Sequence, residues 1–493
     1  MQKKNINEKK QTAEVTNSAG LGVMALAAIV VSSMIGGGIY SLPQNMAANA
    51  SAGAVLSAWI ITGLGVYFIA NTFRILSNVR PDLTAGIYMY SREGFGPYIG
   101  FTIGWSYWLC QICGNVGYAV ITMDALNYFF PPYFAGGNNI YSIIGGSALI
   151  WGFNFLVLKG IKQATVVNFI GTIGKIVPLL LFILIMAFVF NSDNFSFDFW
   201  GENTKISKLG DLPTQIKSTM LVTLWAFIGI EGAVVMSQHA KSAQSVGRAT
   251  LLGFVACLSI YILLSILPFG YMNQEQLASI PNPSTAGILE QVVGKWGAWI
   301  MNIGLLISVL SSWLAWTMVT AQIPQAAAKN GTFPKEFAAE NKNHAPSVSL
   351  WVTSALMQIF MLLVYFSNNA WNTMLSITGV MVLPAYLSSS AYLWKICEDH
   401  EYPQNSKIKR SFALFSGMVG SIYALWLIYA AGLKYLLLAV IFVALGIPVY
   451  IWSRKQNNPK ESVFSKTESV IACCLIIIAV IAIYAMKTGI IQI

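Results

Sequence analysis

Residues 20–47 form an uncharged stretch of membrane-spanning length that carries three consecutive glycines, Gly36, Gly37 and Gly38. Each glycine inside a helix costs about 1 kcal/mol relative to alanine. A backbone polar group without a partner in hydrocarbon costs several kcal/mol more. A helix that only had to span a bilayer would not contain this sequence. We therefore predict that the helix is interrupted at these glycines, beside a cavity that a polar molecule enters.

A second apolar stretch, residues 221–237, is interrupted in the same manner by Gly229, Glu231 and Gly232. Glycine-interrupted spans in the two halves of one chain point to a secondary transporter whose substrate site lies near the middle of the membrane. The sequence therefore predicts two broken helices, the first and the sixth, that share one site.

The composition places the whole chain in a membrane, because 56% of the residues are hydrophobic, only 10% are charged and the mean hydropathy is +0.62. Soluble domains carry about 25% charged residues. At about 20 apolar residues per span, we expect about thirteen transmembrane helices. Their expected ranges are 20–47, 51–77, 97–129, 140–157, 164–190, 216–238, 246–271, 286–327, 347–366, 370–396, 410–430, 433–453 and 467–487.

The net charge of +10 is explained by topology. Most of the 29 lysines and arginines fall in the N-terminal tail or in loops on the same side of the expected spans. This excess follows the positive-inside rule, so the N-terminus is expected in the cytoplasm and the chain in the cell (plasma or inner) membrane as a multi-pass protein. Nucleic acid is not an expected partner. The lipid bilayer is an expected partner, and a homodimer is one expected form of assembly.

The fold class expected is an all-α integral membrane protein. Residues 1–19 form the cytoplasmic tail, residues 20–396 a transport core, and residues 397–493 additional transmembrane helices. The core divides into two five-helix repeats, about 20–190 and 216–396. Because five is odd, the second repeat starts from the opposite side of the membrane, so the repeats are inverted.

Two charged residues fall deep inside expected spans, where burying a charge is expensive and usually functional. Glu231 lies within the second break and is a candidate gating acid, although it also suits a capping role on freed backbone amides. Lys175 lies in the middle of the fifth span. Its ammonium is expected either to take the place of a coupling sodium ion or to satisfy carbonyls of the first broken helix, and the two interpretations are compatible.

The groups around the breaks suit a cationic amino acid. Free amides at Gly36, Gly37 and Gly38 would accept a carboxylate, since no side chain blocks its approach. Freed carbonyls near Ile228 would accept an α-ammonium. Trp225 and Trp316 are the aromatic residues expected deep in the membrane, where the face of an indole attracts a cation. Neither a cofactor nor a metal ion is expected.

Four motifs resemble the basic amino acid/polyamine antiporters of the amino acid–polyamine–organocation superfamily. They are SSMIGGGIYSLPQNMA, FGPYIGFTIGWSYWLCQICGN, TLWAFIGIEGAVVMS and WTMVTAQIPQAAAKNGTFPK, in the first, third, sixth and eighth expected spans. The GIEGA form and the thirteen spans look most like arginine/ornithine antiporters. The resemblance covers almost the whole chain and implies the LeuT-type inverted repeat of five plus five helices.

The resemblance also implies roles for particular residues. The carboxylate-binding break matches Ser33, Ile35, Gly36, Gly37 and Gly38. Tyr107, Gln111 and Asn115 match third-helix contacts, Ile228 the carbonyl for the α-amino group, and Trp316 the aromatic stacked on the guanidinium. Trp225 matches a gate aromatic, Glu231 a gating acid, and Lys175 the lysine that replaces sodium. Two departures leave the substrate open: Gly37 replaces a common serine, and Gln111 a smaller side chain.

We therefore expect a sodium-independent exchange of external arginine for internal ornithine by alternating access. Lysine/cadaverine, agmatine/putrescine and histidine/histamine pairs, or a proton-coupled amino acid symporter, are alternatives. A channel is disfavoured because the TVGYG filter pattern is absent from the sequence. An enzyme is disfavoured because all three histidines fall in expected loops and no HExxH motif occurs. An amino acid sensor that does not transport would keep the same site, and a flux measurement separates it.

Overall fold

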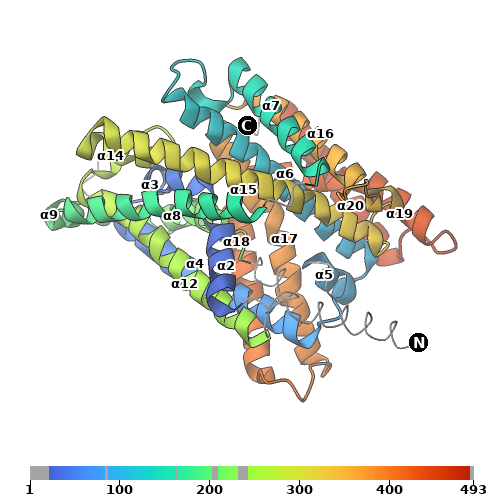
Figure 1. Cartoon of the computed structure of the whole chain (residues 1–493). Helices are drawn as coiled ribbons and strands as arrows, with labels where there is room; N and C mark the ends of the chain where they lie inside the picture. Colours follow the sequence, from blue (N-terminus) through green and yellow to red (C-terminus); the bar gives the residue numbers. More distant parts are fainter. Residues whose placement is uncertain (1–21, 84–86, 161–163, 202–208, 231–242, 489–493) are drawn as a thin grey trace, which may run out of the picture.

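The computed structural model describes residues 22–83, 87–160, 164–201, 209–230 and 243–488, and within these ranges the chain is helical and contains no strand (Figure 1). The α-helices are α2 (Val23–Met34), α3 (Leu42–Ala47), α4 (Ala52–Val79), α5 (Ile87–Phe95), α6 (Pro97–Asn127), α7 (Ile140–Leu158), α8 (Ala164–Phe188), α9 (Ser192–Phe197), α10 (Leu212–Ala226), α12 (Ala243–Ile266), α13 (Gln274–Ser279), α14 (Ser284–Val293), α15 (Lys295–Lys329), α16 (Ser347–Leu363), α17 (Ala370–Glu398), α18 (Arg410–Ala444), α19 (Ile447–Asn457) and α20 (Lys466–Lys487). The 3₁₀ helices are η1 (Gly37–Ser41), η2 (Ala135–Gly137), η4 (Leu267–Gly270), η5 (Lys335–Ala338) and η6 (Val364–Phe366).

The described residues contain nine helices long and apolar enough to cross a membrane, or ten if the bent pair near the N-terminus is one span. The chain is therefore a multi-pass membrane protein. Three expected spans are not counted separately. The apolar part of α8 is short (Ile173–Phe188), α10 has only 15 residues, and Arg410–Asn457 counts once although Gly432 interrupts α18 with φ 77° and ψ 154°. The number thirteen stays a prediction.

One expected boundary is wrong. The sequence predicts a single span over 286–327, but α14 ends at Val293 and α15 begins at Lys295. Between them Gly294 has φ 84° and ψ −169°, a conformation outside the helical region. Glu290, Gln291 and Lys295 flank this corner, but the apolar residues on both sides of them make 286–327 resemble one span. The spanning helix is therefore α15, over Lys295–Lys329.

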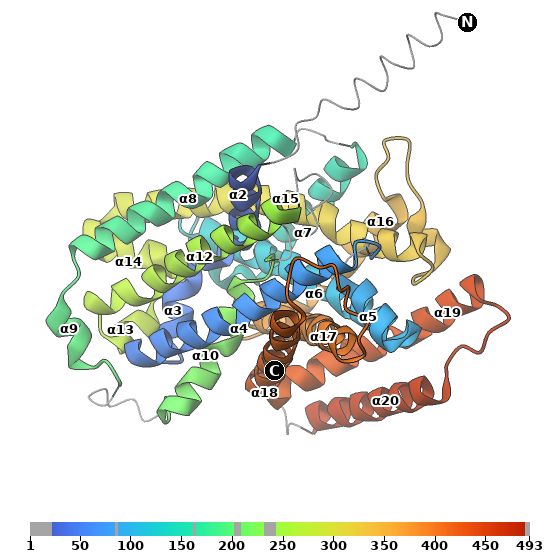
Figure 2. The same cartoon turned by 90° about the horizontal axis from the view of Figure 1, so that it is seen from below.

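The helices α6 and α17 form the centre of the molecule. They pack against each other, and 78% and 83% of their apolar windows are buried. By contrast, only 17% of the α20 window is buried, and α20 lies at the edge of the molecule (Figure 2). Its exposed residues include Val470, Ile477 and Ile481. An apolar outer face of this kind suits contact with lipid, whereas α6 and α17 are placed to form the walls of an internal site.

The first predicted helix interruption is present, and the start of the second lies within the described residues. The first helix, α2, ends at Met34, and the chain resumes as η1 at Gly37 with a bend of 52° between the two segments. The second, α10, ends at Ala226 and continues as a turn through Ile230. In this turn Gly229 has φ 106°, which side chains other than glycine rarely tolerate. Residues 231–242, including Glu231, lie outside the described ranges.

Candidate substrate site

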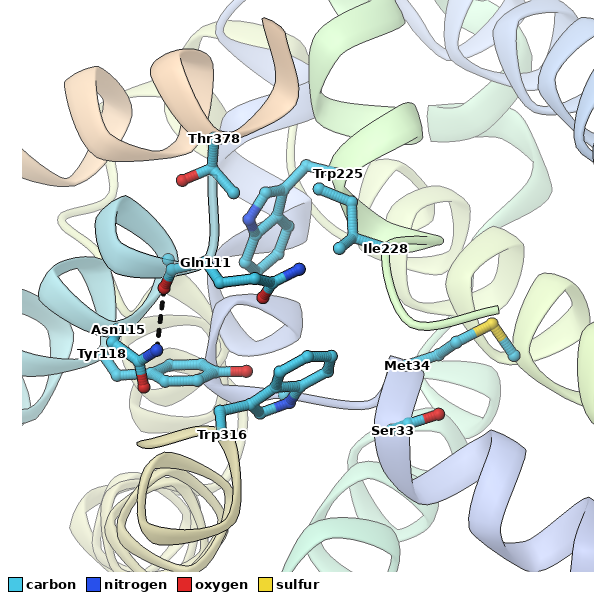
Figure 3. A pocket seen from close by; sticks show the side chains of 11 residues that line it. Ser33, Met34, Gln111, Asn115, Tyr118, Trp225, Ile228, Trp316 and Thr378 are labelled. Carbon is cyan, nitrogen blue, oxygen red and sulfur yellow. Dashed lines mark hydrogen bonds between the residues drawn. The ribbon is translucent and has the colours of Figure 1, made fainter. Parts of the chain in front are cut away.

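The two breaks border one cavity that is also lined by α6, α15 and α17 (Figure 3). Its lining residues come from five helices that are far apart in the sequence. They are Ser33, Met34, Gly36, Gln111, Gly114, Asn115, Tyr118, Trp225, Ile228, Trp316 and Thr378. None of these described residues is charged, so they would meet a bound cation with aromatic faces and neutral oxygen atoms.

A hydrogen bond joins the two breaks directly. The Ser33 hydroxyl lies 2.8 Å from the Val30 carbonyl oxygen, one turn earlier in α2, and 3.0 Å from the carbonyl oxygen of Gly229. The backbones approach so closely that a Cβ on Gly229 would lie 2.9 Å from the Ser33 carbonyl oxygen. The break after α10 therefore requires glycine both for its backbone angle and for this contact.

The glycines of the first break allow close packing. A Cβ on Gly37 would lie 2.0 Å from Val309 Cγ2, and one on Gly38 would lie 1.8 Å from the Trp225 ring. Gly37 and Gly38 begin η1, and no side chain caps that helix. The first amides of a helix have no partner within it and carry its positive dipole end. The amides that begin η1 therefore suit an anionic group, and the neighbouring Gly36 lines the cavity.

Three buried polar atoms at the opposite wall have no hydrogen-bond partner among the described residues. They are Gln111 Nε2, Asn115 Oδ1 and Thr378 Oγ1. Asn115 is held in place by its Nδ2, which donates to the Gln111 carbonyl oxygen at 2.8 Å and to Thr320 Oγ1 at 3.0 Å. Buried polar groups are nearly always paired, so three unpaired atoms around one cavity call for a polar occupant.

Aromatic rings enclose the space between the breaks and this polar wall. In Figure 3 the indoles of Trp225 and Trp316 lie on either side of the Gln111 carboxamide. Trp225 is fixed by an edge contact with Trp371, with ring centroids 5.5 Å apart and planes at 86°. Tyr118 lies with its hydroxyl oxygen 2.8 Å from the position that a Cβ on Gly36 would take. The cavity is therefore amphipathic, with polar ends and aromatic sides.

Lys175 does not line the cavity. It is buried, and its Nζ donates to the Ser32 carbonyl oxygen at 2.9 Å and to Ser32 Oγ at 3.3 Å. Tyr40 in η1 donates in turn to the carbonyl oxygens of Gly174 and Lys175, at 3.2 and 3.3 Å. Through these bonds α8 holds both sides of the first break. This is the contact that the backbone interpretation of Lys175 expects.

The structure brings together most of the predicted site residues. Those that line the cavity are Ser33, Gly36, Gln111, Asn115, Trp225, Ile228 and Trp316. Those that do not are Ile35, Gly37, Gly38 and Tyr107, all buried in the surrounding packing. Glu231 lies outside the described residues.

The sequence prediction missed Met34, Gly114, Tyr118 and Thr378. Gly114 and Tyr118 follow Gln111 by three and seven residues, so helical spacing alone was a usable signal for them. Met34 directly precedes the break. Thr378 lies within the unbroken helix α17, and its sequence context carries no signal that places it at a site.

Comparison with known proteins decides the family. The model of the amino acid permease family matches residues 21–480. The chain belongs to the amino acid permease family. This permease is therefore a membrane transporter and not an enzyme, in agreement with the superfamily resemblance of its motifs.

Three similar proteins are each named arginine/agmatine antiporter. The protein of Chlamydia abortus is 64% identical over 470 residues, which cover 95% of the permease and 97% of that protein. That of Chlamydia pneumoniae is 62% identical over 484 residues, covering 98% and 100%. That of Chlamydia trachomatis serovar L2 is 60% identical over 469 residues, covering 95% and 97%. These names agree with the branch of the superfamily that the motifs predict.

Proposed function

We propose that this permease is an antiporter of basic amino acids that exchanges external arginine for internal agmatine by alternating access, without sodium. Ornithine, the counter-substrate expected from the sequence, is the second candidate. The similar proteins named arginine/agmatine antiporter favour agmatine. We place the chain in the cell inner membrane with its N-terminus in the cytoplasm.

One observation carries the proposal: a cavity whose described lining residues are uncharged joins two helix breaks to a pair of tryptophans and a set of polar atoms unpaired among the described residues. Arginine has a matching distribution of groups. Its carboxylate suits the amides that begin η1, and its α-ammonium suits the Ile228 carbonyl. Its guanidinium suits the faces of the Trp225 and Trp316 indoles beside the Gln111 carboxamide, with Asn115 Oδ1 as acceptor.

Agmatine keeps the guanidinium and an amine but lacks the carboxylate. It therefore retains the aromatic contacts and the interactions with carbonyl oxygens, and leaves the η1 amides without an anion. The two substrates then differ by one electrostatic contact, which allows both to bind the same cavity in turn. Lys175 of α8 holds its ammonium group against the Ser32 carbonyl of α2, next to the first break. This positive charge takes the place of a coupling sodium ion.

Counterflow in proteoliposomes tests the proposal. Uptake of labelled arginine is measured into vesicles that contain agmatine, ornithine or no substrate, with sodium or with N-methylglucamine outside. We expect rapid uptake only against internal agmatine, equal in both media. Rapid uptake into empty vesicles that follows a pH gradient would instead indicate a proton-coupled symporter, and no flux at all would indicate a sensor.

Membrane potential distinguishes the two counter-substrates. Arginine carries one positive charge and agmatine two at neutral pH, so each exchange moves one positive charge out of the vesicle. An inside-positive potential should therefore accelerate uptake against agmatine, and an inside-negative potential should slow it. Exchange against ornithine moves no net charge. Uptake that prefers internal ornithine and ignores the potential would replace agmatine by ornithine.

A further inference from the structure

A second hollow lies between α4 and α12, away from the substrate site. It is lined by Tyr67, Ala70, Asn71, Arg74, Gly247, Thr250, Leu251 and Phe254, and we name it the Arg74 groove. The two helices pack side by side along it in both views (Figures 1 and 2). Leu251 is 47% exposed at its rim, so the groove opens on the outer surface of the helix bundle.

Arg74 is the only charged residue among the groove's lining residues. Its Nε is buried and has no hydrogen-bond partner in the described part of the chain. Among the described residues, none of the ion pairs with a carboxylate involves Arg74. Gly247 makes room for the side chain, because a Cβ there would lie 2.7 Å from Arg74 Cδ. A half-buried guanidinium without a counter-ion is a site for an anion.

Polarity changes along the groove in one direction. Arg74 lies five residues before the end of α4 and Gly247 four residues after the start of α12, so both lie about 7 Å inside the helix ends at 1.5 Å per residue. Asn71 and Thr250 come next. Tyr67 and Phe254 are two turns deeper than Arg74 and Gly247, and their ring centroids lie 6.5 Å apart.

This arrangement matches one kind of molecule. A phospholipid carries its anionic phosphate at the depth of the helix ends and its acyl chains deeper in the bilayer. We propose that the Arg74 groove binds an anionic phospholipid. Arg74 donates to the headgroup phosphate, and the apolar surface of Tyr67, Leu251 and Phe254 receives the start of an acyl chain.

Native mass spectrometry of the delipidated protein in detergent tests the proposal. Phosphatidylglycerol and phosphatidylcholine with the same acyl chains are titrated separately into the wild type and three variants. Arg74→Gln removes the charge, and Arg74→Lys keeps it. The matched control is Arg248→Gln, one residue from Gly247 but exposed to solvent. We expect Arg74→Gln to weaken retention of the first phosphatidylglycerol about fivefold, and Arg248→Gln to leave it unchanged.

Further arms identify the source of the anion and guard against misfolding. Inorganic phosphate should not displace phosphatidylglycerol from the wild type, and phosphatidylcholine should bind more weakly. Equal retention in Arg74→Gln and the wild type, equal binding of phosphatidylcholine, or displacement by free phosphate would each overturn the proposal. If Arg74→Gln fails to fold, the proposal is tested by phosphatidylglycerol retention in the charge-conserving Arg74→Lys variant and by the competition experiment on the wild type. Failure here leaves the transport proposal untouched, because Arg74 does not line the substrate cavity.

Discussion

The Ser33 hydroxyl on the first broken helix lies 3.0 Å from the carbonyl oxygen of Gly229 on the second. Two segments 196 residues apart in the sequence thus meet through one side chain at the wall of the cavity. A carrier of this kind changes access by moving one group of helices against another. The hydrogen bond between Ser33 and Gly229 joins the two broken helices, so a movement of one against the other must change it.

Replacing Ser33 by alanine should destabilise the junction of the breaks. Loss of the hydrogen bond from Ser33 to the Gly229 carbonyl costs about 1 kcal/mol. We expect a lower midpoint of thermal unfolding in detergent and slower arginine exchange. Ser57→Ala is the matched control, because the Ser57 hydroxyl bonds only to Gly53 within α4, at 2.8 Å. Equal stability and flux in the two variants would contradict a role for the junction.

Changing Trp316 to leucine should weaken cationic substrates specifically. Loss of a desolvated cation–π contact of about 1–2 kcal/mol corresponds to about 5- to 30-fold weaker arginine binding. Citrulline has nearly the same shape as arginine but no side-chain charge. Its inhibition of arginine transport, which is weaker at the outset, should therefore change much less in this variant. Trp299→Leu is the control, since Trp299 lies on the same helix and is 52% exposed. Equal losses for arginine and citrulline would show that Trp316 acts only by filling space.

Gly37→Ala should reduce transport because its Cβ would overlap Val309 Cγ2. The double variant with Val309→Ala removes the opposing methyl groups, so it should recover part of the lost exchange rate. Gly152→Ala in α7 meets no atom within 4 Å and should leave transport unchanged. A double variant no better than Gly37→Ala would mean that the free backbone, rather than the packing, makes Gly37 necessary.

Lys175→Met should slow exchange strongly without preventing insertion into the membrane. The Ser32 carbonyl loses its charged partner and the positive charge next to the first break disappears. We expect at least tenfold slower arginine exchange, in the range of a lost charge-assisted hydrogen bond of about 1.5–3 kcal/mol. Lys159→Met removes an exposed lysine and should be neutral. Wild-type flux in Lys175→Met would exclude Lys175 from coupling.

The pH dependence of stability should report an ion-pair cluster outside the spans. Arg80 donates to Asp82 at 2.7 Å and to Glu93 at 3.1 Å, and also bonds the Tyr392 hydroxyl. The hydrogen bond from Arg80 lowers the pKa of Asp82 below its ordinary value of 3.8. Because the pKa of Asp82 is lower in the folded protein than in the unfolded chain, its ionised form stabilises the fold at pH values above the unfolded-state pKa. This stabilisation is lost as the pH falls through the folded-state pKa.

Asp82→Asn should therefore lower the unfolding midpoint at pH 7, and the difference from wild type should shrink below about pH 4. The effect stays under about 1 kcal/mol because the pair is solvent-screened. A difference that is constant from pH 7 to pH 3 would show that the charge of Asp82 does not contribute.

The local sequence identified residues that are energetically unfavourable inside any membrane helix. Three adjacent glycines in the first break, Gly229 in the second and a lysine in mid-span are costly in hydrocarbon, so their presence alone indicated breaks and a buried charge. The same reasoning missed the corner at Gly294, because apolar residues resume after Lys295 and hydropathy does not report backbone angle.

The sequence by itself determined that the chain is a multi-pass helical carrier with two interrupted helices, because the energetic cost of unpaired polar groups in lipid depends on residue type alone. Only the tertiary structure decided which atoms share a cavity. Thr378 on unbroken α17 lines it, whereas Gly37 and Gly38 are covered by Val309 and Trp225. Which faces of α2, α6, α10, α15 and α17 meet depends on packing among helices that are apolar on nearly every side, and periodicity cannot resolve that choice.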